Sequence, residues 1–166
     1  MIETPKIVLK LNQNWLNQFK ILLDHNKLHA RCWFWDHFDW EKQSLWIGKF
    51  IKTNHLPNKN EQINEILHKL ITDFNSLMEL KSDTYLKIYF SRNAKSDEPE
   101  INYLLICNTH TLPESFNSTL VDVMFEKYQL TEAIINKNIN YKQLIDHYIN
   151  WDNNYTYYDL MGELNS

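Results

Sequence analysis

The spacing of apolar residues predicts helices near the start of the chain and in its middle. A first helix runs to about Asn26, and its apolar face recurs at offsets of four, seven and eight from Trp15. The most regular pattern predicts a helix over 61–80. Its apolar face consists of Ile63, Ile66, Leu67, Leu70, Ile71, Phe74, Leu77 and Met78.

Two strand-like segments follow this helix. Residues 85–92 alternate, with Leu86, Ile88 and Phe90 on one face, whereas 101–108 contain an unbroken apolar run. Alternation is typical of a strand, and an unbroken run is typical of a strand covered on both faces. The polar segment between them predicts a loop, so the two strands form an antiparallel hairpin.

The part after the hairpin predicts further helices. The first starts near Thr111, and its apolar face comprises Phe116, Leu120, Val123, Met124 and Tyr128. A short helix is predicted over 131–136, and a last helix begins at Asn140, with an apolar face of Leu144, Ile145, Tyr148 and Ile149. This order of elements predicts an α+β fold, with helices packed on a small antiparallel sheet whose hairpin covers about 85–108.

Two segments have less regular patterns. Residues 7–11 are either a first strand or the lead-in to a helix. The aromatic-rich segment 28–56 fits neither period cleanly, and we interpret 39–51 within it as a helix. The length of 166 residues suits a single globular domain over 1–166.

Composition narrows the classes of function. With only two glycines, Gly48 and Gly162, the chain has no glycine-rich phosphate loop and no G-x-S-x-G nucleophile elbow, so we expect no nucleotide cofactor. No apolar run reaches the length of a membrane span, and the N-terminus lacks the pattern of a signal peptide. We therefore expect a cytoplasmic protein in which Cys32 and Cys107 are reduced.

Two clusters of polar residues could carry chemistry. His25, His29 and Cys32 are of types that bind zinc, although no paired zinc motif accompanies them. Asp36, His37 and Asp39 combine carboxylates with an imidazole, as acid–base catalysis requires, provided that they converge in a cleft. The second cluster supports an alternative reading of the chain as a small enzyme.

Charge is distributed unevenly along the chain. Residues 1–96 hold 14 basic and 10 acidic residues, whereas 97–166 hold 3 basic and 11 acidic ones. The acidic part is also rich in Tyr and Trp, which are common at protein–protein hot spots, and carboxylates around them would steer a basic partner. The predicted partner-binding residues are Asp146, Tyr148, Trp151, Asp152, Tyr155, Tyr157, Tyr158, Asp159 and Glu163.

In this character the chain resembles the immunity proteins of bacterial contact-dependent growth inhibition and polymorphic toxin systems. The resemblance covers the whole chain in general terms and rests on no family signature. It implies a protein without catalytic, metal or cofactor sites that neutralises a cognate, basic toxin such as a nuclease by contact. A second alternative is a nucleic-acid-binding module that uses Lys6, Lys10, Lys20, Lys27, Arg31 and the aromatic cluster 33–35.

Overall fold

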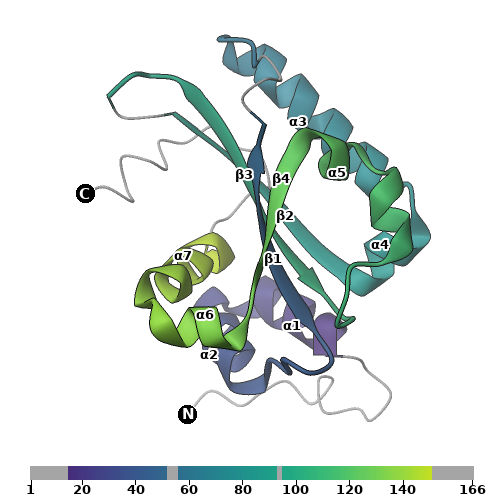
Figure 1. The fold of residues 1–166 in the computed structure, drawn as a ribbon, viewed down its shortest axis with the longest axis vertical. Coiled ribbons are helices and arrows are strands. Elements are labelled where there is room, and N and C mark those ends of the chain that lie inside the picture. The colour runs from purple at the N-terminus through teal and green to yellow at the C-terminus, as the bar shows by residue number, and fades with distance from the viewer. Residues whose placement is uncertain (1–14, 52–55, 93–94, 151–166) are drawn as a thin grey trace.

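Four antiparallel strands form one sheet in the order β2-β3-β1-β4 (Figure 1). The structure is a computed structural model, and it describes residues 15–51, 56–92 and 95–150. The strands are β1 (Ser44–Phe50), β2 (Thr84–Arg92), β3 (Pro99–Cys107) and β4 (Phe125–Leu130). The predicted α+β class and the predicted hairpin, here formed by β2 and β3, are confirmed.

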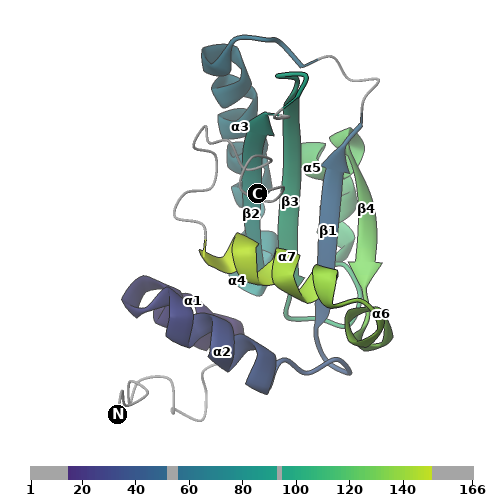
Figure 2. The same cartoon turned by 90° about the vertical axis from the view of Figure 1, so that its left-hand side faces the viewer.

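Helices cover both faces of this sheet (Figures 1 and 2). One face carries α1 (Trp15–His25), α2 (Lys27–His37), α6 (Glu132–Lys137) and α7 (Ile139–Asn150). The other carries α3 (Asn60–Asn75), α4 (Met78–Asp83), the 3₁₀ helix η2 (Glu114–Ser118) and α5 (Leu120–Met124). None of the described helices is long and apolar enough to cross a membrane.

The alternation of side chains along the strands produces two separate cores. On β3, Leu104 and Ile106 pack with α1, α2 and α7, whereas Tyr103 and Leu105 pack with α3 and α4. All four side chains are fully buried. The unbroken apolar run that the sequence shows in β3 therefore reflects helices on both faces of this strand.

The helix predicted over 39–51 is wrong, because β1 occupies most of this range. β1 lies between β3 and β4 and is covered on both faces, so Leu45 and Ile47 belong to one core while Trp46 packs against the other. Burial on both faces removes the polar–apolar alternation that would have indicated a strand.

Helix α2 was missed by the sequence prediction. The first helix ends at His25, and the Asn26 side chain then caps α2 by accepting a hydrogen bond of 2.9 Å from the His29 amide. Asn is a favoured N-cap residue, so it separates two helices here rather than ending the helical segment.

The helix predicted to continue from Thr111 to Tyr128 is also wrong. The structure has η2, then α5, then β4 in this range. Thr119 starts α5 by accepting a hydrogen bond of 3.1 Å from the Asp122 amide, and the chain becomes extended at Phe125. The prediction over 61–80 is confirmed for α3, but a break follows this helix and α4 begins at Met78. The predicted helices over 131–136 and from Asn140 correspond to α6 and α7.

Candidate partner-binding site

The histidines considered for zinc lie on different helices. His25 ends α1 and His29 lies in the first turn of α2, with the N-cap residue Asn26 between them. Within 15–51, 56–92 and 95–150, no group of three or more His, Cys, Asp or Glu side chains is placed to hold a metal ion.

The cluster of Asp36, His37 and Asp39 has local structural contacts instead of a shared cleft. The His37 ring stacks on Trp33 with centroids 4.6 Å apart, and its Nδ1 lies 2.9 Å from the Trp33 carbonyl oxygen. The Asp39 carboxylate accepts a hydrogen bond of 3.0 Å from the Glu41 amide, and Asp36 is exposed. The described contacts of His37 and Asp39 are therefore with nearby residues of α2 and of the turn that follows it.

The aromatic residues proposed to stack on nucleic-acid bases are occupied by protein contacts. Trp33 is buried in the core. The Trp35 indole donates a hydrogen bond to Asp146, and the Lys142 ammonium lies 5.2 Å from its ring centroid. Lys6 and Lys10 lie outside the described residues.

Two of the predicted partner-binding residues lie in α7, and both have structural roles. Tyr148 is buried and stacks on Tyr89 at a centroid distance of 4.1 Å, so its ring belongs to the core and not to the surface, contrary to the prediction. Asp146 is half-buried and joins α7 to α2 through Trp35. The remaining predicted residues lie outside the described residues; they are Trp151, Asp152, Tyr155, Tyr157, Tyr158, Asp159 and Glu163.

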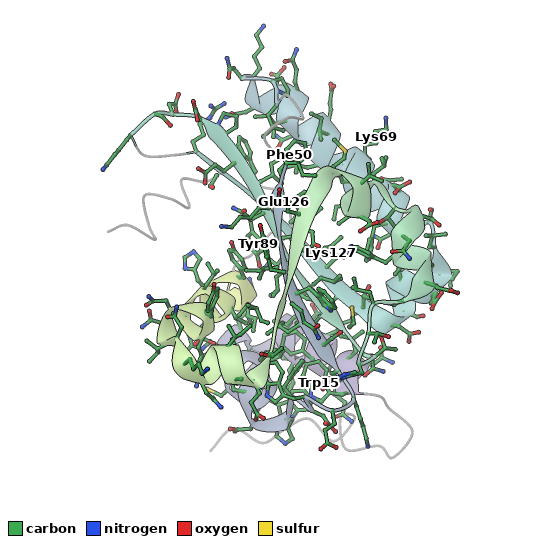
Figure 3. The ribbon with its side chains drawn as sticks, viewed as in Figure 1. Trp15, Phe50, Lys69, Tyr89, Glu126 and Lys127 are labelled. Atoms are coloured by element: carbon green, nitrogen blue, oxygen red, sulfur yellow. The ribbon has the colours of Figure 1, made fainter. Side chains whose placement is uncertain are left out.

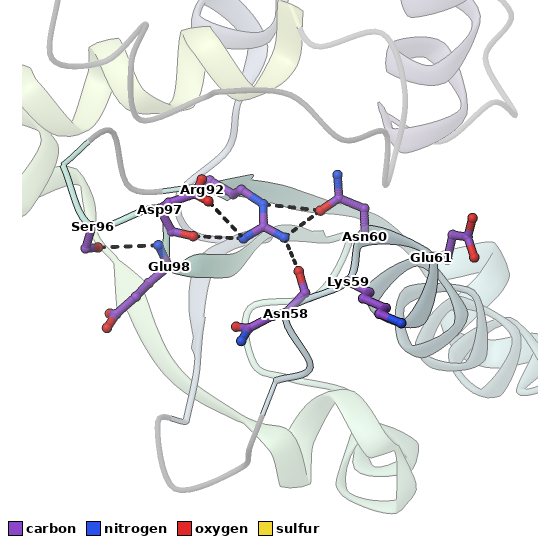
Figure 4. Close-up of a pocket in the computed structure, with 8 residues that line it drawn as sticks. All are labelled: Asn58, Lys59, Asn60, Glu61, Arg92, Ser96, Asp97 and Glu98. Carbon is purple, nitrogen blue, oxygen red and sulfur yellow. Dashed lines mark hydrogen bonds and ion pairs between the residues drawn. The ribbon is translucent and has the colours of Figure 1, made fainter.

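An open, polar pocket lies where the β2–β3 hairpin meets the N-terminal end of α3 (Figure 4). Its lining residues are Asn58, Lys59, Asn60, Glu61, Arg92, Ser96, Asp97 and Glu98. They come from the segment that leads into α3, from the end of β2 and from the hairpin loop. The pocket therefore depends on two segments that are more than thirty residues apart in the sequence.

Arg92 joins these segments. Its guanidinium donates hydrogen bonds to the Asn60 Oδ1 atom (3.2 Å from Nε and 2.6 Å from Nη2), to the Asp97 carbonyl oxygen (2.8 Å) and to the Asn58 carbonyl oxygen. Its side chain is only 11% exposed. Since these bonds use most of the donors of the guanidinium, Arg92 holds the pocket together and is not available to bind an anion.

The lining residues carry three carboxylates and two cations, and one cation, Arg92, is mostly buried and lies 4.0 Å from the Asp97 carboxylate, so the exposed rim is weakly acidic. Glu61, Asp97 and Glu98 are exposed carboxylates, and Lys59 is the exposed cation among the lining residues. Asp97 lies in the hairpin turn with a positive φ of 58°, a conformation that Asp tolerates better than most residues. The Arg92 guanidinium ties Asp97 to the segment that leads into α3 through their carbonyl oxygens.

The last turn of α7 packs on Tyr89 of β2, on the face of the sheet opposite to α3: the Tyr89 hydroxyl donates a hydrogen bond to the Tyr148 carbonyl oxygen. Burial raises the pKa of the Tyr148 hydroxyl, and the nearby charge of Glu100 on β3 raises it further.

Sequence reasoning predicted this hairpin loop but did not identify it as a site. A signal was present, because Asp97, Glu98 and Glu100 place three carboxylates in four residues at a loop, where binding residues are often found. The contribution of Arg92 could not be read from the sequence, since it depends on contacts with Asn58 and Asn60.

No protein-family model matches this chain, and a search of curated proteins finds no significant relative. The candidate site therefore rests on the geometry of the described residues alone.

Proposed function

We propose that the protein is an immunity protein, which binds a basic protein toxin such as a nuclease and neutralises it by contact. The observation that supports this best is the polar pocket with three exposed carboxylates, Glu61, Asp97 and Glu98, where Arg92 ties the hairpin to the segment that leads into α3. A surface of this kind steers a basic partner and orients it on arrival. Nuclease toxins are suitable partners because they are themselves basic in order to bind phosphates.

The contacts of the polar residues also favour binding over chemistry. His37 and Asp39 are occupied within α2 and the turn that follows it, and Arg92 is directed at protein oxygens. The acidic rim would repel the phosphates of nucleic acid, so a nucleic-acid partner is disfavoured at this pocket.

The test is co-expression with the product of the adjacent upstream gene, followed by purification and measurement of association rates. We expect a stoichiometric complex with a basic protein that stops growth when it is expressed without this chain. The double variant Asp97→Lys, Glu98→Lys should slow association by at least about tenfold at low salt, because both carboxylates are exposed at the rim.

Glu41→Lys is the matched control for a change of charge. Glu41 is exposed and lies beside the start of β1, at the opposite end of the sheet from the hairpin. It should leave the association rate nearly unchanged. A complex that forms equally fast with the double variant would place the interface elsewhere, and a neighbouring product that neither binds nor is toxic would refute the immunity function.

A further inference from the structure

Among the strands of the described residues, β4 pairs only with β1, so its other edge is open. The other edge strand, β2, has buried side chains at Lys87, Tyr89 and Ser91. In β4, by contrast, four consecutive residues, 126–129, are exposed between the buried Phe125 and Leu130. An exposed strand edge offers unpaired backbone groups to another strand.

The pairing with β1 determines which backbone groups of β4 point outward. The Ile51 amide donates a hydrogen bond of 3.0 Å to the Met124 carbonyl oxygen, so this pair is of the hydrogen-bonded type. Because the two types of pair alternate in an antiparallel ladder, Glu126 and Tyr128 also bond to β1. The amide and carbonyl groups of Phe125, Lys127 and Gln129 then face the open edge.

Exposed apolar side chains gather along this edge. The described residues include six large, exposed apolar side chains, and four of them lie between Val123 and Ile139. Val123 is 65% exposed just before β4, Tyr128 is 47% exposed within it, and Ile134 is 36% exposed just after it. Val123 of α5 and Ile134 of α6 flank the strand on opposite faces of the sheet, and Tyr128 is the exposed large apolar side chain of β4 itself.

We infer that β4 pairs with β4 of a second copy of this chain across a two-fold axis through Tyr128, so that the two sheets join into one. The inference does not depend on the immunity function. It rests on the direction of the backbone groups and on the charges along the strand, which together leave one favourable register.

The direction of the backbone groups first decides whether the two-fold axis passes through a residue or between two residues. In a symmetric antiparallel pair, outward-facing residues must oppose outward-facing residues to form hydrogen bonds. An axis that falls between two residues would oppose an outward-facing residue to an inward-facing one. The axis must therefore pass through a single position of β4.

Charge then selects among these positions. An axis at Glu126 would oppose two carboxylates, and an axis at Lys127 would oppose two ammonium groups, which is destabilising. An axis at Gln129 would leave part of the strand unpaired. An axis at Tyr128 opposes the two Tyr128 rings, which is a favourable cross-strand pair.

This register also matches the neighbouring residues. Lys127 of each copy pairs with Gln129 of the other, and each pair can exchange two backbone hydrogen bonds. Lys127, which is labelled in Figure 3, forms an ion pair with Asp122 at 2.7 Å, and in this register it lies opposite Gln129 and not opposite Lys127 of the other copy.

The first test is the mass of the purified protein in solution by analytical ultracentrifugation. We expect a species of twice 20.1 kDa whose share rises with protein concentration. Gln129→Pro should abolish it by removing an outward amide that is not bonded to β1, a position where an edge strand tolerates proline. Gln129→Ala keeps the amide and should remain dimeric.

A disulfide test fixes the register and remains informative if the proline variant does not fold. In a Cys32→Ser background, which removes the exposed thiol, Tyr128→Cys should cross-link on oxidation, because opposite Cα atoms in a non-hydrogen-bonded pair are about 4.5 Å apart. Gln129→Cys is the control, since two such residues are offset along the strands and too distant to join. A monomer at all concentrations, or equal cross-linking at both positions, would overturn the inference.

Discussion

The close approach of Tyr103 to Gly48 allows a quantitative test of the packing between β1 and β3. The two residues are opposite each other in the ladder, and the Tyr103 ring lies across the Gly48 backbone. A Cβ atom added at Gly48 would lie 2.0 Å from Tyr103 Cε2 and 2.3 Å from Cζ. Gly48 does not have a positive φ, so the requirement for glycine comes from space and not from backbone conformation.

We predict that Gly48→Ala destabilises the protein by about 2 kcal/mol. Ordinary carbon contacts are about 3.5–4.0 Å, so the rigid ring must move by more than about 1 Å. Tyr103 is fully buried and packs against Phe125 at a centroid distance of 5.1 Å, so its displacement disturbs the core. Overpacking of this kind costs about 1–3 kcal/mol, and the lower chain entropy of Ala offsets about 0.5 kcal/mol.

A double-mutant cycle with Tyr103 separates this clash from other effects of the substitution. Unfolding in urea gives the free energies, and a loss of 2 kcal/mol corresponds to a fall in Tm of about 4–8 °C. In a Tyr103→Leu background, Gly48→Ala should be nearly neutral because the ring is absent. In a Tyr103→Phe background the ring remains, so the cost should stay near 2 kcal/mol.

Two results would refute this reasoning. A cost below about 0.5 kcal/mol in the wild-type background would mean that the ring moves aside freely. An equal cost in the Tyr103→Leu and Tyr103→Phe backgrounds would mean that the substitution acts through something other than the ring.

The remaining predictions concern titratable groups. Burial raises the pKa of the Cys107 thiol to about 12. A disulfide reagent at pH 8 should therefore modify the exposed Cys32 rapidly and Cys107 only after unfolding. Rapid reaction of two thiols in the folded protein would contradict the burial of Cys107. The free energy of unfolding should fall as pH rises above about 9. Burial raises the pKa of five groups in the folded state, so above this pH the unfolded chain releases protons that the folded chain retains. These groups are Cys107, Tyr85, Tyr89, Tyr103 and Tyr148. The effect of Lys20 on the free energy of unfolding has the opposite sign, since burial lowers its pKa, but it is one group against these five. A free energy of unfolding in urea that stays constant from pH 8 to 11 would contradict this prediction.

The parts of the fold that the sequence predicted have a recognisable pattern of apolar residues. Helix α3 has a polar surface and a buried stripe, and Leu86, Ile88 and Phe90 alternate along β2, although β2 itself is buried on both faces. β1 was taken for a helix because its side chains are buried on both faces, and β4 was taken for the end of a helix because apolar residues of α5 precede it. In both cases the structure depends on strand pairing between distant segments, which local periodicity does not report.

The candidate site, too, could be predicted from the sequence only in part. The acidic character of the second half of the chain was evident from residue counts, and the hairpin that carries part of it was predicted. The sequence could not show that Tyr148 faces the core, because Tyr is common both in cores and at interfaces. It also could not show that Arg92 connects the hairpin to the start of α3, since that contact joins segments separated along the chain.

The two proposed surfaces lie on different elements, and this separation has a consequence. The polar pocket is formed by the β2–β3 hairpin and α3, whereas the free edge is β4, and β1 and β3 lie between β2 and β4 in the sheet. Pairing through β4 would therefore leave both pockets open in a dimer. One dimer could then bind two copies of a basic partner, and a complex of two chains with two partners is the stoichiometry expected when both proposals hold. A complex of one chain with one partner, formed from a chain that is dimeric on its own, would instead mean that the partner competes for β4, and it would place the binding surface at the strand edge.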